Sequence, residues 1–258
     1  MCRLIKLILF FKKETTLREI VRLLDKIENE NKAYDRSYIY RIIKNRLISR
    51  NEVTKETRGG KVLYRLTPKG LETISGIRVT DDVIRALLIA IARELGGVLE
   101  WENISLENAF TDFNYVLEVN GREIYIRVEE GTHIPDNVSE VKSSEALKEM
   151  IKPCIPYLLK LLNEKILLGN IREDAKIHKD KQFLIIINGS DPRTIPKELR
   201  DAINDIAHEE ELLTLKGAIK RIENLIEQLP ENVKIVFTKN DLAGTKIEIE
   251  EAIKNMVF

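Results

Sequence analysis

The chain has 258 residues, of which 43% are hydrophobic and 33% are charged, and its 42 Lys and Arg balance its 42 Asp and Glu. This composition excludes a disordered chain, and the length allows two modest domains that each have a core. Two distant cysteines and three scattered histidines exclude a disulfide framework or a zinc cluster as the basis of the fold, so we expect no cofactor.

No stretch approaches the ~18 apolar residues that a membrane-spanning helix needs. The apolar run at residues 4–11 is interrupted by Lys6 and has no small-residue cleavage site after it, which argues against a secretory signal. We therefore expect a cytoplasmic protein without a membrane partner. Abundant Ile, Lys and Glu with little Gln resemble the composition of thermophile proteins.

The neutral total conceals a strong charge asymmetry. Residues 1–79 contain 19 Lys and Arg against 9 Asp and Glu, a net charge of +10, and residues 80–258 carry −10. Excess positive charge in a small domain is the electrostatic signature of a polyanion binder. We expect two domains, 1–79 and 80–258, of which the first binds nucleic acid.

Three helices are predicted at the start of the basic half. Residues 3–13 repeat apolar side chains at helical spacing. Thr16, with Glu19 three residues later, forms a capping-box pattern for a second helix that begins at Leu17. Asp35 or Ser37 can cap a third helix, which continues to about residue 49.

The third helix has two chemically different sides. Four apolar residues form one stripe: Ile39, Ile42, Ile43 and Leu47. The remaining side carries small polar, basic and aromatic residues: Ser37, Tyr38, Arg41, Lys44 and Asn45. Side chains of these types on the exposed side of a short helix suit insertion into a DNA groove.

A hairpin follows the third helix. Two strand-like runs, 51–57 and 61–67, are joined at Gly59-Gly60, and paired glycines supply the positive φ angles of tight hairpin turns. Cations surround this turn: Lys55, Arg58 and Lys61. Pro68 then opens a further helix, where its fixed φ is favourable.

Three helices, a two-stranded wing and the closing phrase YRLTPKGLETI together resemble the winged-helix family of DNA-binding regulators, with the MarR- and PadR-like branches nearest. The resemblance covers residues 3–76. The run RLISRNEV is similar to the family phrase RLEERGLV, with Asn51 where Gly is usual. The resemblance implies that the third helix enters the major groove and that the wing cations contact phosphates. A winged helix that contacts protein is the open alternative.

The acidic half alternates helices and strands. Residues 113–119 and 123–129 are predicted to form a hairpin around Asn120-Gly121, after a helix at 82–95 and a strand at 98–104. The later elements are predicted as a helix at 143–168, kinked by Pro153 and Pro156, a buried strand at 181–189, helices at 196–209 and 212–229, a strand at 233–239 and a helix at 246–256. The expected fold class is therefore α/β, with a mixed central sheet in this domain.

This order resembles the restriction-endonuclease-like core. That family uses an acidic residue on the second core strand and a Glu-x-Lys pair on the third to hold magnesium. Here Asp112 lies near the first position, but the third strand has Arg127-Val128-Glu129, which is the reverse of the required order. We therefore expect a degenerate core that does not cleave DNA and that holds no metal.

The sequence predicts a double-stranded DNA-binding protein, most simply a homodimeric transcriptional regulator whose C-terminal domain oligomerises or senses. We do not expect an enzyme. One alternative is a DNA-targeted nuclease in which Mg²⁺ is held by Asp112 and Glu129, with Arg127 beside them. Another is a replication or partition factor of a mobile element, which would share the same DNA-binding chemistry.

Overall fold

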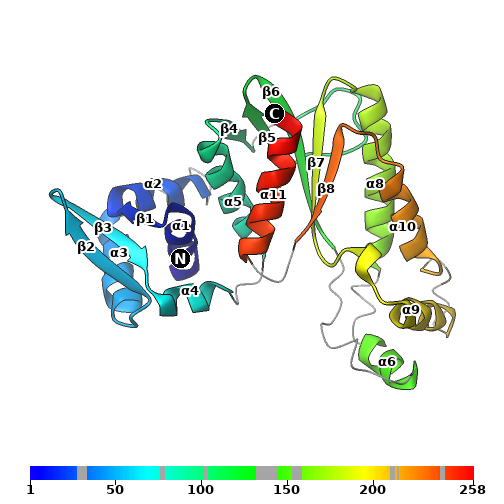
Figure 1. The fold of residues 1–258 in the computed structure, drawn as a ribbon, viewed down its shortest axis with the longest axis horizontal. Coiled ribbons are helices and arrows are strands. Elements are labelled where there is room, and N and C mark those ends of the chain that lie inside the picture. The colour runs from blue at the N-terminus through cyan, green and yellow to red at the C-terminus, as the bar shows by residue number, and fades with distance from the viewer. Residues whose placement is uncertain are drawn as a thin grey trace. The chain divides into compact units, whose positions relative to one another are not determined.

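The computed structural model describes residues 1–27, 34–75, 79–101, 104–131, 144–152, 159–209, 213, 215–238 and 242–258. The chain forms two compact units, Met1–Val98 with Asn240–Lys246 (unit 1) and Leu99–Lys239 with Ile247–Phe258 (unit 2). Unit 1 contains a three-stranded sheet and unit 2 a five-stranded mixed sheet (Figure 1). The predicted α/β class with a mixed central sheet is confirmed. No helix among the described residues is long and apolar enough to cross a bilayer.

Unit 1 begins with the three predicted helices. They are α1 (Cys2–Lys12), α2 (Leu17–Ile27) and α3 (Arg36–Ile42), and the last continues as a π-helical segment, η1 (Ile43–Ile48). The predicted cap of α2 is present, because the Thr16 hydroxyl accepts the Glu19 N–H at 3.3 Å. Asp35 caps α3, with its carboxylate accepting the Ser37 N–H at 2.8 Å.

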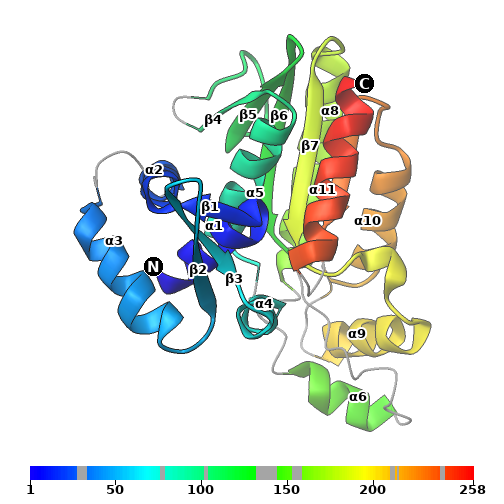
Figure 2. The ribbon, with the colours of Figure 1, turned by 60° about the vertical axis from the view of Figure 1, so that its left-hand side comes forward.

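The strands of unit 1 form one antiparallel sheet in the order β1-β3-β2 (Figure 2). The predicted hairpin is β2 (Val53–Arg58) and β3 (Lys61–Leu66), and Gly59 and Gly60 have φ of 57° and 74°. Both central residues of the turn therefore have the positive φ of a type I′ turn. β1 (Glu14–Thr16) is a strand that the sequence analysis did not predict. Helix α4 (Pro68–Ser75) follows the hairpin.

The core of unit 1 also includes α5 (Asp81–Glu94). This helix packs on α1, and nine of its residues are buried. Arg93 of α5 donates to the Glu19 carboxylate of α2 at 2.8 Å, and Arg85 donates to the Ile27 carbonyl at 2.9 Å. The predicted junction between residues 79 and 80 therefore lies inside unit 1, which continues to Val98.

The sheet of unit 2 has the strand order β4-β5-β6-β7-β8. Its strands are β4 (Val98–Glu100), β5 (Tyr115–Val119), β6 (Arg122–Glu130), β7 (Gln182–Asn188) and β8 (Val233–Phe237). β5 and β6 are antiparallel around Asn120 and Gly121, whose φ angles are 54° and 73°. β6, β7 and β8 are parallel, so the sheet is mixed as predicted.

Helices α8 (Lys160–Ile177) and α10 (Ala218–Glu227) cover one face of this sheet, and α11 (Leu242–Val257) lies on the other (Figure 1). The core beneath α8 and α10 includes fully buried Phe183, Ile185 and Ile187. Two shorter helices are α6 (Ser144–Ile151) and α9 (Lys197–Glu209), and η4 (Pro192–Thr194) is a single 3-10 turn.

The boundaries of two helices in unit 2 differ from the prediction. The single helix expected at 143–168 is replaced by α6 and by α8, which extends to Ile177. Residue 143 and the predicted kink at Pro153 and Pro156 lie outside the described residues. The helix expected from residue 212 begins at Ala218, because Gly217 adopts a left-handed conformation with φ of 68°.

Candidate nucleic-acid interface and a cavity in unit 2

The outer side of α3 and η1 carries the predicted helix residues. All five are exposed: Ser37, Tyr38, Arg41, Lys44 and Asn45. The opposite stripe is buried, with Ile39, Ile42, Ile43 and Leu47 at most 6% exposed. The π-helical turn contains Lys44 and Asn45, and its wider backbone places them at different angles from those of an α-helix.

Cations on this outer side are not neutralised by neighbours. Neither Arg41 nor Lys44 has an ion pair or hydrogen bond within the part of the chain that the structure describes. Arg36 and Arg46 are also exposed and unpaired there, and the sequence analysis did not single them out. Unpaired cations on one helix keep their charge available for phosphate oxygens.

The hairpin register divides the three predicted wing cations between two faces. Arg58 is paired directly with Lys61, and Lys55 is paired with Tyr64. Since side chains alternate along a strand, Arg58 and Lys61 share one face while Lys55 lies on the other. Arg65 lies four residues after Lys61 and shares its face. The sequence places Arg65 near the turn, but it was not predicted as a phosphate contact, although the strand period of two indicates this shared face.

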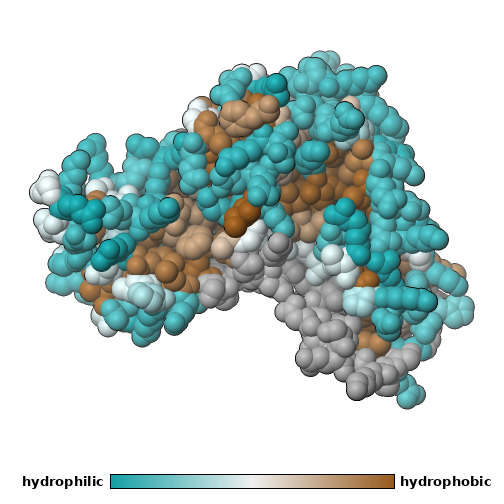
Figure 3. Space-filling view, in the orientation of Figure 1, coloured by the Kyte–Doolittle hydropathy of each residue, from teal (hydrophilic) through white to brown (hydrophobic). Residues whose placement is uncertain are grey.

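Arg58 differs from the other hairpin cations in its partners. Its guanidinium contacts the Glu14 and Glu56 carboxylates, each at 3.2 Å. Lys61 and Arg65 have no such partner among the described residues. The hairpin end of unit 1 is covered mainly by hydrophilic side chains (Figure 3). Lys61 and Arg65 are therefore better placed than Arg58 to neutralise phosphates.

A buried ion pair holds the base of the hairpin in place. Lys6 of α1 contacts the Glu52 carboxylate at 2.9 Å, and the Lys6 ammonium also donates to the Thr73 hydroxyl of α4 at 2.9 Å. The Glu52 carbonyl accepts the Thr67 N–H at 3.1 Å, and Gly70 packs directly against that carbonyl. These contacts join α1, the hairpin and α4 into one support for the exposed cations.

A second candidate site lies in unit 2, where the structure brings Asp112, Arg127 and Glu129 together in a cavity of about 280 Å³. Arg127 donates from Nε and Nη2 to Glu129 Oε2, at 3.1 and 2.6 Å. Its Nη1 donates to the Asp112 carbonyl oxygen at 2.9 Å. The guanidinium therefore bridges the two acidic residues that the nuclease interpretation assigns to magnesium.

These residues do not fit a magnesium site. One carboxylate oxygen of Glu129 already accepts hydrogen bonds from Arg127. The positive charge of Arg127 disfavours a second cation beside Glu129. Within the described ranges, no group of three or more His, Cys, Asp or Glu side chains is placed to hold a metal ion.

Thr111 in the wall of this cavity provides a stability prediction. Its side chain is buried, and its hydroxyl has no hydrogen-bond partner among the described residues. Because an unpaired buried hydroxyl is costly, we expect Thr111→Val to raise the free energy of unfolding by about 1 kcal/mol. Urea denaturation followed by circular dichroism measures this change. Thr111→Ser is the control and should lower stability, since it keeps the hydroxyl and removes a methyl group. A less stable Val variant would contradict the prediction.

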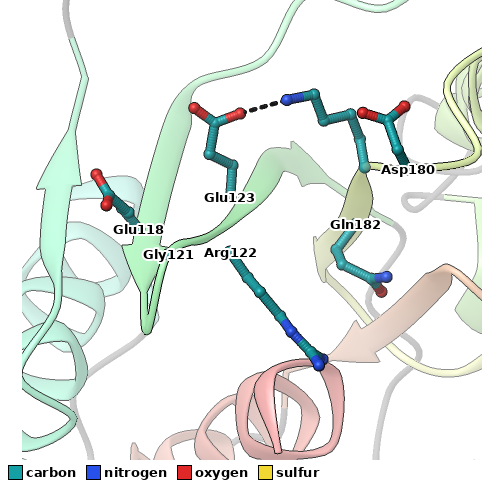
Figure 4. A pocket seen from close by; sticks show the side chains of 7 residues that line it. Glu118, Gly121, Arg122, Glu123, Asp180 and Gln182 are labelled. Atoms are coloured by element: carbon teal, nitrogen blue, oxygen red, sulfur yellow. Dashed lines mark hydrogen bonds and ion pairs between the residues drawn. The ribbon is translucent and has the colours of Figure 1, made fainter.

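A larger cavity, of about 610 Å³, lies beside the β5–β6 turn (Figure 4). Its two cations have partners within the protein: Lys181 contacts Glu123 at 2.7 Å, and Arg122 donates to the Met256 carbonyl at 3.2 Å. The hydrogen bond that the Lys181 ammonium donates to the Glu123 carboxylate raises the pKa of Lys181. Burial is the main cause that raises the pKa of the Tyr125 phenol, and the Glu123 charge adds to it. This surface therefore offers no unpaired cation for a polyanion.

Comparisons with known proteins identify no family. No family model and no solved structure matches the chain. A stretch of 145 residues, 55% of the chain, is 28% identical to serine/threonine-protein kinase greatwall of Danio rerio. The matched stretch is 16% of that protein's length, so this chain spans only a small part of it.

Proposed function

We propose that the protein binds double-stranded DNA through unit 1, as a transcriptional regulator with a winged-helix domain. The observation that carries this proposal is the outer side of α3 and η1, where five exposed polar, basic and aromatic side chains include Arg41 and Lys44 without partners. A helix of this kind suits the major groove, where basic and amide side chains bind base edges and phosphates.

The arrangement of unit 1 supports the same proposal. Three helices precede a hairpin whose turn carries Lys61, and Arg65 lies on the same face of the ribbon. A winged-helix domain combines a groove-binding helix, here α3 with η1, with a two-stranded wing, here the β2–β3 hairpin. The net charge of +10 on residues 1–79 supplies the electrostatic attraction that brings a protein to a polyanion.

In this proposal the acidic unit 2 oligomerises or senses, and the regulator is a cytoplasmic homodimer. Two copies would place two α3 helices on half-sites of a palindromic sequence. Selection of bound sequences from a random duplex pool tests this arrangement, because a dimer enriches an inverted repeat and a monomer a single half-site.

Fluorescence anisotropy with a labelled random-sequence duplex tests DNA binding itself. If Arg41, Lys44, Lys61 and Arg65 each neutralise one phosphate, affinity should fall by about a hundredfold between 50 and 200 mM salt. A protein that fails to bind duplex DNA even at 50 mM salt would overturn the proposal.

A DNA-targeted nuclease is the second candidate, because Asp112, Arg127 and Glu129 line one cavity. Since Arg127 occupies the carboxylate that a metal would need, we expect no nicking of supercoiled plasmid in the presence of Mg²⁺ or Mn²⁺. Gel electrophoresis measures this outcome. Cleavage that Asp112→Ala abolishes would instead establish the nuclease and the metal site.

A further inference from the structure

Helix α8 carries two stripes of residues on opposite sides. One stripe is buried against the sheet and consists of Leu161, Leu168, Ile171 and Ala175, each at most 2% exposed. The outer stripe repeats every seven residues and consists of Leu159, Asn163, Ile166, Asn170, Glu173 and Ile177. At 3.6 residues per turn, the two stripes lie about 160° apart around the helix. Alternating steps of four and three residues are the spacing of a two-helix coiled coil.

The apolar members of the outer stripe are exposed. Leu159, Ile166 and Ile177 are 41%, 61% and 52% exposed. Phe110, which lines the same cavity as Ile166, is 63% exposed, and its N–H donates to the Asp174 carboxylate of α8 at 2.6 Å. This bond holds the loop before β5 against α8. Large apolar side chains gathered on one side of a helix stabilise an interface when a partner removes them from water.

A second copy of the chain is the partner whose chemistry matches this stripe. When two α8 helices run side by side in the same direction, each residue of the stripe meets its own equivalent, so apolar side chains contact apolar ones. The amides of Asn163 and Asn170 have no hydrogen bond elsewhere in the described ranges, and each can donate to and accept from the facing amide. Asparagine at such positions specifies two helices in one register.

Glu173 is the one charged member of the outer stripe, and its charge is neutralised within α8. Lys176 donates to the Glu173 carboxylate at 2.8 Å, and Arg172 donates to it at 3.3 Å. The stripe therefore brings no uncompensated like charge to the centre of a symmetric pair.

The two flanks of the outer stripe differ in charge, which selects the parallel direction. On one flank, Lys165 has no ion pair with any residue that the structure describes. On the other flank, the Asp112 carboxylate shares a cavity with Asn163 and Leu167 and likewise has no partner in the described ranges. A two-fold axis along α8 brings these unlike flanks together, whereas antiparallel helices would place each flank against itself.

We propose that a second copy of this chain covers the outer stripe of α8, so that two α8 helices form a parallel, two-fold symmetric pair. Ile166 lies at the centre of this interface, the asparagine amides bond across it, and Lys165 of each copy contacts Asp112 of the other. The pair places the dimer interface in unit 2. Its use in binding two DNA half-sites rests on the proposed function, whereas the association itself does not.

Sedimentation velocity of the full chain over a range of concentrations tests the association. The unmodified protein should sediment as a dimer at micromolar concentration. Ile166→Glu should weaken the dimer by at least about a hundredfold, because it places two carboxylates at the centre of the interface. Ile247→Glu is the matched control, since Ile247 is 54% exposed on α11, on the other face of the sheet, and the dimer should be unchanged.

Three results of this measurement would overturn the proposal. They are a monomeric unmodified protein at every concentration, an intact dimer in Ile166→Glu, and equal weakening in both variants. Circular dichroism checks that both variants are folded.

Disulfide cross-linking tests the direction of the helices. In a protein with Cys2→Ser and Cys154→Ser, Asn163→Cys should give a covalent dimer on oxidation, because parallel pairing places each new thiol beside its equivalent. Ile247→Cys measures cross-linking by random collision. A dimer in which Asn163→Cys gives no more covalent product than Ile247→Cys would overturn the parallel pairing.

Binding to DNA distinguishes this proposal from the proposed function. Ile166→Glu leaves the outer side of α3 intact, so it should bind a duplex with one half-site as tightly as the unmodified protein and lose the preference for an inverted repeat. If the unmodified protein dimerises through α8 but binds no duplex DNA, the proposed function fails and the α8 pair stands.

Discussion

Replacement of Arg41, Lys44 and Lys61 together by alanine is expected to weaken binding to duplex DNA by roughly 500-fold at 0.1 M salt. Each of these exposed side chains lacks a partner among the described residues, so each can neutralise one phosphate. Loss of three phosphate contacts should reduce the slope of log K against log salt by about 2.7. Anisotropy titrations across a salt series measure both quantities.

The matched control removes the same charge from unit 2. Lys179, Lys197 and Lys220 are also exposed and have no partner within the described residues. Their joint replacement by alanine should leave the affinity and the slope close to those of the unmodified protein. Equal weakening in both triple variants would show that overall charge, not the surface formed by α3 and the hairpin, attracts DNA. Full affinity in the first variant would place the DNA contact elsewhere.

Gly70→Ala is expected to destabilise the protein by about 3 kcal/mol or more. A Cβ atom at this position would lie 2.0 Å from the Glu52 carbonyl oxygen and 3.0 Å from its carbon. Both are backbone atoms, and Glu52 is also held by its ion pair with Lys6, so they cannot move aside independently. Urea denaturation measures the loss, and DNA binding should fall with it because α4 and the hairpin share this contact.

Gly169→Ala provides the control for this substitution. Gly169 also lies within a helix, α8, but a Cβ atom there would meet nothing within 4 Å. Because alanine loses less backbone entropy than glycine in a helix, this variant should be more stable by about 0.5–1 kcal/mol. Opposite signs for the two variants would confirm that the close approach to Glu52, not helix propensity, makes glycine necessary. A stable Gly70→Ala variant would contradict the packing of α4 on the hairpin.

Elements of unit 1 with strong local signals were predicted well. The Thr16 and Asp35 caps, the buried stripe of α3 and the Gly59-Gly60 turn each depend on residues that are close in sequence. Strand β1 was missed because its three residues form a strand only by pairing with β3, whose residues lie about fifty positions later in the chain. No local pattern reports such a long-range pairing.

The cavity around Asp112 in unit 2 likewise could be predicted only in part from the sequence. Asp112, Arg127 and Glu129 were grouped in the nuclease alternative because they lie near the positions that the restriction-endonuclease-like pattern assigns to its metal site. The sequence pattern did not reveal that Arg127 would donate hydrogen bonds to the Glu129 carboxylate and neutralise its charge. It also did not reveal Asn163 and Asn170, which reach the cavity only because α8 crosses that face of the sheet. Such neighbours depend on tertiary packing.

The attachment of α5 to α1 affects how shortened forms of the protein should be interpreted. A fragment that ends at residue 79 lacks α5, together with the bonds from Arg93 to Glu19 and from Arg85 to Ile27. Its uncovered apolar side would promote aggregation. A failure of that fragment to bind an oligonucleotide would therefore reflect lost packing, even though every proposed DNA-contacting side chain is still present.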